Sequence, residues 1–70
     1  MQGVYLVGFD IQPGTYRVSD PDGAYAARLA VLPTGEWDIL DNGLNDGSVI
    51  LTVQPGDFAF EFRGVLELVE

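Results

Sequence analysis

The residues best suited to chemistry in this chain begin with a lone tryptophan between two carboxylates, Trp37 between Glu36 and Asp38. An exposed aromatic ring beside carboxylates suits carbohydrate binding, but large aromatic side chains also dominate the energetics of hydrophobic cores. Strand alternation places Trp37 on the same face as Ile39. We therefore favour a buried Trp37, and keep a sugar site at Glu36, Trp37 and Asp38 as an alternative.

A second polar group lies in the segment DNGLNDG, residues 41–47, which offers Asp41, Asn42, Asn45 and Asp46. Their side-chain oxygens are the hard ligands that calcium prefers, although the spacing is not that of an EF-hand loop. The same residue types also form turns without any metal. We expect an irregular loop or tight turn without a cofactor, and keep a calcium site as an alternative.

The composition argues against an enzyme. The chain has no cysteine and no histidine, and its three cations are all arginines, Arg17, Arg28 and Arg63. It therefore lacks the usual general bases and nucleophiles, and Ser19 and Ser48 have no such base to activate them. The absence of cysteine and histidine also excludes a disulfide and the usual zinc sites. We predict a protein without catalytic residues.

The charge is strongly negative, because eleven carboxylates face three arginines, for a formal net charge of -8. Binding to nucleic acid or to anionic membranes depends on Lys and Arg, so neither is expected. Surface acidity keeps a small domain soluble, and it can also attract a basic partner. An acidic inhibitor that mimics nucleic acid is a further alternative function.

A short phrase occurs twice, as IQPGTYRV at residues 11–18 and as VQPGDFAF at residues 53–60. Proline presets the φ of the second position of a type II turn, and glycine accepts the positive φ of the third. Alternating apolar residues follow each phrase, with Phe58, Phe60 and Phe62 after the second. The repeat predicts two equivalent turns, each of which begins a strand.

The rest of the chain also has the pattern of short strands separated by turn residues. The expected strands include residues 4–9, 24–32, 36–40, 48–53 and 65–69. The connection PTG between two of them predicts a hairpin, with Gly35 in a left-handed conformation. A helix over 24–32 is the rival interpretation. The period-two alternation of its larger side chains and its short length argue against it.

About seven short antiparallel strands must hide their apolar faces, which predicts an all-β fold. We expect one domain over residues 1–70, built as a small β-sandwich, with a small β-barrel as the alternative. The predicted interior consists of large apolar residues at alternating positions. These are Tyr16, Val18, Leu29, Ile39, Leu51, Val53, Phe58, Phe60 and Phe62.

The order of these motifs resembles a small domain of largely uncharacterised secreted proteins and lipoproteins of actinobacteria. The matching stretches are VYLVGFDIQPGTYRV, GAYAARL and DILDNGLNDGSVILTVQPGDFAFEFRG, which cover nearly the whole chain. That family has two cysteines, at positions that hold Ala24 and about Val65 here, and an aromatic residue where this chain has Ala26. The resemblance implies a small β-domain with no defined activity, from which the disulfide of secreted relatives is missing.

These observations predict a non-catalytic protein-interaction or structural module. The lack of lysine suits a GC-rich genome, so we expect the source to be an actinobacterium or its phage. A domain this small, without disulfide or metal, is short of core and has sheet edges to pair. We therefore expect a protein partner and a homodimer, formed by edge pairing or through faces with Tyr5, Leu6, Leu66 and Leu68. The start of the chain lacks the basic segment of a signal peptide. Together with the absence of cysteine this favours the cytoplasm, although the proteins that it resembles are often secreted.

Overall fold

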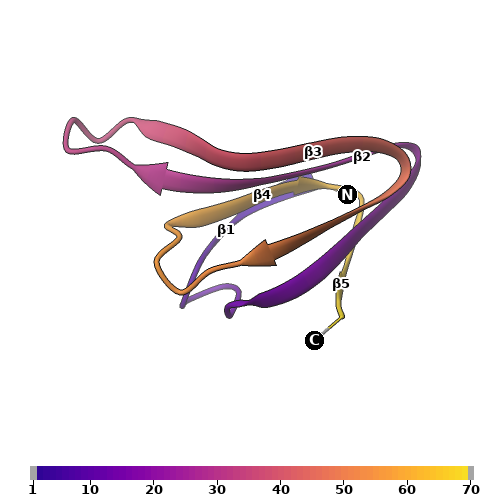
Figure 1. The fold of residues 1–70 in the computed structure, drawn as a ribbon, viewed down its shortest axis with the longest axis horizontal. Coiled ribbons are helices and arrows are strands. Elements are labelled where there is room, and N and C mark those ends of the chain that lie inside the picture. Colours follow the sequence, from indigo (N-terminus) through magenta and orange to yellow (C-terminus); the bar gives the residue numbers. More distant parts are fainter. Residues whose placement is uncertain (1, 70) are drawn as a thin grey trace.

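The computed structural model describes residues 2–69, and every regular element in this range is a strand. The strands are β1 (Gln2–Leu6), β2 (Gly14–Val31), β3 (Trp37–Val53), β4 (Ala59–Arg63) and β5 (Val65–Leu68). All of them pair antiparallel in one sheet, in the order β1-β4-β2-β3, while β5 pairs with another part of β2 (Figure 1). The all-β prediction is confirmed, and the sheet does not close into a barrel.

Two strands are much longer than predicted, because each joins two of the short strands that the sequence indicated. β2 has 18 residues and β3 has 17, and they pair from Gly14 opposite Val53 to Val31 opposite Trp37. Residues 41–47, which were expected to form an irregular loop, lie within β3. That prediction was wrong because the turn-forming residues bend the strand without ending its pairing with β2.

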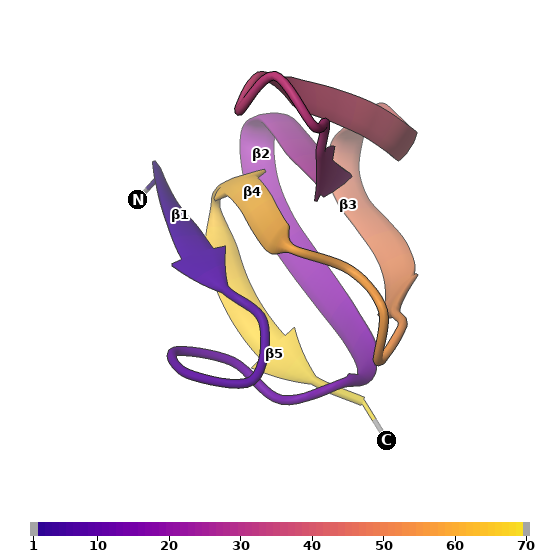
Figure 2. The same cartoon turned by 90° about the vertical axis from the view of Figure 1, so that its left-hand side faces the viewer.

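The long hairpin of β2 and β3 folds over at one corner, so that a single sheet makes two layers (Figures 1 and 2). At this corner β2 carries a bulge at residues 21–23, and bulges bend the strand that contains them. One glycine in each chain segment that turns the corner has a positive φ: Gly23 at 125°, Gly47 at 104° and Gly64 at 134°. Glycine adopts such angles without the steric penalty of a Cβ atom. The corner is therefore encoded by glycines that resemble turn signals.

The two layers form the small β-sandwich that the sequence predicted. The four-stranded layer consists of β1, β4, residues 24–31 of β2 and residues 37–45 of β3. The three-stranded layer consists of β5, residues 14–20 of β2 and residues 47–53 of β3. Because both long strands pass through both layers, the core lies inside one folded sheet.

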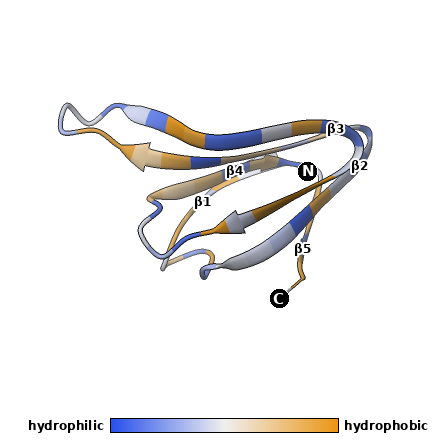
Figure 3. Ribbon diagram, viewed as in Figure 1, coloured by the Kyte–Doolittle hydropathy of each residue, from blue (hydrophilic) through white to orange (hydrophobic). Residues whose placement is uncertain are grey.

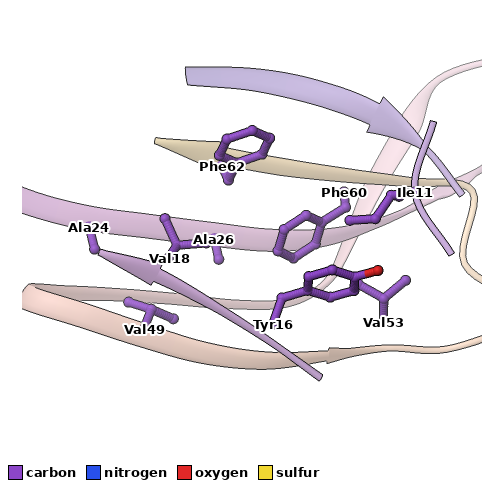
Figure 4. Packing of buried hydrophobic residues seen from close by; sticks show 9 residues of the cluster. All are labelled: Ile11, Tyr16, Val18, Ala24, Ala26, Val49, Val53, Phe60 and Phe62. Atoms are coloured by element: carbon purple, nitrogen blue, oxygen red, sulfur yellow. The ribbon is translucent and has the colours of Figure 1, made fainter. Parts of the chain in front are cut away.

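The core between the layers receives apolar side chains from both (Figure 4). It contains Ile11, Tyr16, Val18, Ala24, Ala26, Val49, Val53, Phe60 and Phe62. The rings of Phe60 and Phe62 stack with their centroids 6.1 Å apart. Of the predicted interior residues, only Ile39 is exposed, while Leu51 and Phe58 are half-buried.

The hairpin predicted at PTG is confirmed, since the amide of Leu32 donates to the carbonyl of Glu36 at 2.7 Å and Gly35 has a φ of 89°. The strand predicted over residues 24–32 is also confirmed, because β2 extends to Val31.

The two QPG phrases precede β2 and β4 as predicted, but they form different structures. In the second, the amide of Asp57 donates to the carbonyl of Gln54 at 3.1 Å, and Gly56 has no positive φ, so the turn is not of type II. In the first, Gly14 has a φ of 158°, which is not that of a type II turn, and the hydroxyl of Tyr16 donates to the carbonyl of Gln12 at 2.6 Å. The prediction of two equivalent type II turns was wrong because different side chains fix the two copies.

Candidate functional site

The two layers present outer faces of opposite character, which the strand register identifies because cross-strand partners share a face of the sheet. On the three-stranded layer this face is mostly polar, with Thr15, Arg17, Ser19, Ser48, Ile50, Thr52, Val65 and Glu67. On the four-stranded layer it is mostly apolar, and we call it the apolar outer face. It consists of Val4, Leu6, Tyr25, Ala27, Leu29, Val31, Trp37, Ile39, Asn42, Leu44, Ala59, Glu61 and Arg63. Strongly hydrophobic positions recur along the strands of this layer (Figure 3).

Much of the apolar outer face is open to solvent. Leu44 is 70% exposed, Ile39 is 52% exposed and Trp37 is 50% exposed. Two alanines, Ala27 and Ala59, lie between the large side chains and are fully buried. Contiguous exposed apolar surface on a soluble domain commonly marks an interaction site.

An open hollow of about 470 Å³ lies partly on this face. It is lined by Gly3, Val4, Tyr25, Leu44, Glu61, Phe62 and Arg63. The guanidinium of Arg63 donates to the carbonyl of Gly23 at 3.2 and 3.3 Å, and among the described residues no carboxylate forms an ion pair with it. The hollow therefore offers a phenol, a carboxylate and a guanidinium within an otherwise apolar surface.

Residues 1–65 match the family model of the Rv1352-like extracellular domain. The chain belongs to this family. The Rv1352-like family is actinobacterial, which confirms the coarse part of the resemblance seen in the sequence. Searches of the curated proteins and of the solved structures found no significant match. The matched region includes every strand of the apolar outer face.

This Rv1352-like domain places Trp37 on the apolar outer face instead of in the core. The ring meets that of Phe58 edge-on, with the centroids 5.6 Å apart, and half of the residue is exposed. Ile39 shares its face, as alternation predicted, and is also about half exposed, although Leu29 on the same face is buried in a small cluster that includes Phe58. Glu36 lies in the hairpin turn and Asp38 points to the opposite face of β3. The structure thus does not bring the three candidate sugar-binding residues onto one surface.

The four candidate calcium ligands of the Rv1352-like domain lie along β3 instead of around a loop. Asp41 and Asn42 are consecutive strand residues and point to opposite faces. The side chain of Asn45 donates to the carbonyl of Ser48 at 3.1 Å. Within residues 2–69 no group of three or more acidic, histidine or cysteine side chains lies close enough to hold a metal ion. The structure therefore does not assemble Asp41, Asn42, Asn45 and Asp46 into a metal site.

The carboxylates of the Rv1352-like domain do not gather on one face. Glu61 belongs to the apolar outer face, whereas Glu67 lies on the outer face of the other layer and pairs with Arg17 at 3.0 Å. Others lie in turns, at the corner and along β3, so the side chains point in several directions. A mimic of nucleic acid needs its carboxylates on one face, and this distribution does not favour one.

A buried ion pair is the polar feature that sequence reasoning missed. Nε and Nη2 of Arg28 donate to the two carboxylate oxygens of Asp57 at 2.8 and 2.9 Å, and the amide of Gln54 donates to Oδ2 at 2.8 Å. These contacts close the QPGD turn onto the second half of β2. The signal in the sequence was the aspartate at the fourth position of the turn, a residue that can accept hydrogen bonds from nearby backbone.

The ion pair keeps Asp57 charged. The hydrogen bond from Arg28 holds the pKa of Asp57 below its usual range, although burial raises it. The hydrogen bond from the amide of Gln54 also lowers this pKa. The hydrogen bond between Arg28 and Asp57 raises the pKa of Arg28 above its ordinary value. An ionised carboxylate already engaged by three donors is a poor general base. The pair is a structural element of the domain.

The lowered pKa of Asp57 predicts a loss of stability in acid. A carboxyl whose pKa is lower in the folded state contributes stability that is fully present above its unfolded pKa of about 4 and is lost as the pH falls towards the folded value. We expect the free energy of unfolding to fall more steeply below about pH 4 in the natural chain than in Asp57→Asn. Urea titrations across this range measure the difference. Parallel pH profiles would show that Asp57 does not contribute.

Proposed function

We propose that this Rv1352-like domain is a non-catalytic protein-interaction module that binds through the apolar outer face. The observation that carries the proposal is the exposure of large apolar side chains, such as Trp37, Ile39 and Leu44, on one face of the sandwich. Interaction surfaces concentrate aromatic and aliphatic side chains in this way and keep charges at the rim. Apart from Glu61 and Arg63, the apolar outer face has no charged residue.

The sequence of β2 supports a cover over this face. Ala24 and Ala26 point into the core, while Ala27, Leu29 and Val31 point outward, so residues 24–31 are apolar on both sides apart from Arg28. Strands buried on both faces have nearly continuous apolar sequences, whereas a strand with one solvated face alternates. In the described structure the second layer covers the inner face. On the outer face Tyr25 and Phe58 pack only around Ala27, Leu29 and Ala59, which leaves Trp37, Ile39 and Leu44 exposed for a partner.

The family description places related domains outside the cell, and it supports an extracellular setting for this module. The composition instead favoured the cytoplasm. The absence of cysteine is compatible with either setting, since the core and the Arg28–Asp57 pair require no disulfide. An exported interaction module is therefore part of the proposal.

Site-specific photo-crosslinking in the producing cells tests the proposed surface. A photoreactive residue replaces Ile39, which is 52% exposed on the apolar outer face, or Ile50, which is 56% exposed on the polar face of the other layer. Both isoleucines lie on β3, so the pair is matched in residue type, strand and exposure. We expect protein adducts from position 39 and few from position 50. Equal yields, or none from position 39, would refute the proposal.

A further inference from the structure

We infer that the apolar outer face binds a second copy of this chain, packed face to face about a two-fold axis that runs along the strands between β4 and β2. This inference rests on the proposed use of the apolar outer face as a protein-binding surface. β4 and β2 are the two central strands of the order β1-β4-β2-β3. Such an axis therefore lays β4 of one copy over β2 of the other, and β1 over β3.

The distribution of charge permits a second copy to pack on this face in preference to the rest of the surface. The chain has eleven carboxylates and three arginines, and the apolar outer face holds one of each, Glu61 and Arg63. The rest of the chain therefore keeps ten carboxylates (11 minus 1) and two arginines (3 minus 1). Both of those arginines, Arg17 and Arg28, are already paired with carboxylates. The apolar outer face carries no net charge, whereas the remaining surface of two acidic copies repels.

The apolar rows of the face are complementary to themselves about this axis. One cross-strand row reads Leu6, Ala59, Leu29 and Ile39 across the four strands. The two-fold axis reverses the row, so that Ala59 of each copy lies opposite Leu29 of the other, and Leu6 lies opposite Ile39. Leu6 and Ile39 are 38% and 52% exposed, whereas Leu29 and Ala59 are already buried in a cluster that Phe58 packs against. The contact between the copies in this row is therefore made by the exposed pair, Leu6 and Ile39, on either side of that cluster.

The polar residues also find suitable neighbours about the same axis. In the row nearest the corner Arg63 and Tyr25 are cross-strand partners, so the axis lays Arg63 of each copy over Tyr25 of the other. A guanidinium over a tyrosine ring gives a favourable cation–π contact. Glu61 pairs with Ala27 across the strands, so the axis lays Glu61 of each copy over the buried Ala27 of the other. Arg63, two residues along the same face, is the cation next to Glu61 on β4.

The edge of β3 is less suited to self-association than the apolar outer face. Its outer side carries no partner strand in the described structure, but Asp38, Asp41 and Asp46 occur along it and Leu40 interrupts the register as a bulge. Charges and bulges on an edge strand oppose pairing with another chain. The structure therefore favours face packing over edge pairing at β3.

Sedimentation equilibrium of the purified chain tests the inference. We expect the 7.6 kDa chain to dimerise with a Kd of about 10 µM. Ile39→Asp should weaken dimerisation by at least about 100-fold, because it places an unpaired carboxylate in the interface, whereas Ile50→Asp should leave it unchanged. Raising the salt concentration should strengthen the dimer, since it screens the repulsion between the acidic copies.

A rescue experiment separates loss of the interface from loss of the fold. In the inferred dimer Ile39 of one copy lies opposite Leu6 of the other, so Leu6→Arg should also be monomeric. Mixing Leu6→Arg with Ile39→Asp should restore a dimer that contains one chain of each kind.

Three results would overturn the self-pairing: a natural chain that stays monomeric at millimolar concentration, equal loss of the dimer in Ile39→Asp and Ile50→Asp, or a mixture without a mixed dimer. A monomeric chain whose position 39 still crosslinks to another protein in cells would retain the proposed function and reject only the second copy.

Discussion

Replacing Asp57 by alanine is expected to remove a large part of the stability of this domain. The side chain of Asp57 is 2% exposed and that of Arg28, which it binds, is 20% exposed, so Asp57→Ala leaves a largely buried charge and the amide of Gln54 without their acceptor. Removing one partner of such a pair costs about 3 kcal/mol. A chain of this length has a total stability of roughly 4 to 10 kcal/mol. Urea unfolding followed by tryptophan fluorescence measures the loss.

The control for this prediction is the second ion pair of the domain. Arg17 and Glu67 meet at 3.0 Å, but their side chains are 42% and 60% exposed. Glu67→Ala should therefore cost at most about 0.5 kcal/mol, as exposed pairs do. The double change Arg28→Met with Asp57→Ala should recover part of the loss, because it removes the stranded charge. A cost for Asp57→Ala as small as that for Glu67→Ala would show that the buried pair contributes little.

Gly64→Ala should destabilise the domain by about 3 kcal/mol through strain and a steric clash. Gly64 has a φ of 134°, which residues with a Cβ atom rarely adopt. An added Cβ would also lie 2.7 Å from the carbonyl oxygen of Ser19 and 2.9 Å from Cγ1 of Val18. Both neighbours belong to β2, and the carbonyl is backbone that cannot move without disturbing the corner. The midpoint of urea unfolding reports the change.

Gly35→Ala separates the two causes. Gly35 also has a positive φ, 89°, but a Cβ there meets nothing within 4 Å. Only backbone strain remains, so we expect a cost of about 1 kcal/mol. If the two alanine variants lose the same stability, the close approach of Gly64 to Ser19 has no energetic consequence.

The sequence predicted the strands and the core well, because alternation identifies which residues share a face. Phe60 and Phe62 are buried and the turn at Gly35 joins two strands as expected. The corner was not predictable in the same way. A glycine with a positive φ is needed both where a chain reverses and where a paired strand bends, so the Asp-Gly pairs at Gly23 and Gly47 indicated the ends of strands.

The alternation pattern also could not predict the location of the candidate site. Trp37 and Ile39 do share a face, but the pattern says nothing about whether another element covers that face. Both residues are exposed because the chain folds its second layer over the opposite side. The clue in the sequence was residues 24–31, which are apolar at nearly every position although the second layer covers only one side of the strand.

The shared long strands make the two layers one cooperative unit. In sandwiches built from separate sheets, one sheet can loosen while the other keeps its hydrogen bonds. Here β2 and β3 pair with each other through both layers, from Gly14 opposite Val53 to Val31 opposite Trp37. Opening either layer therefore breaks the same hairpin. We expect this hairpin to form first, since the turn at residues 32–36 joins neighbouring residues, whereas β1 must meet β4 from the far end of the chain. The pairing of the hairpin can extend from its turn, and the core closes only when the hairpin bends at the corner.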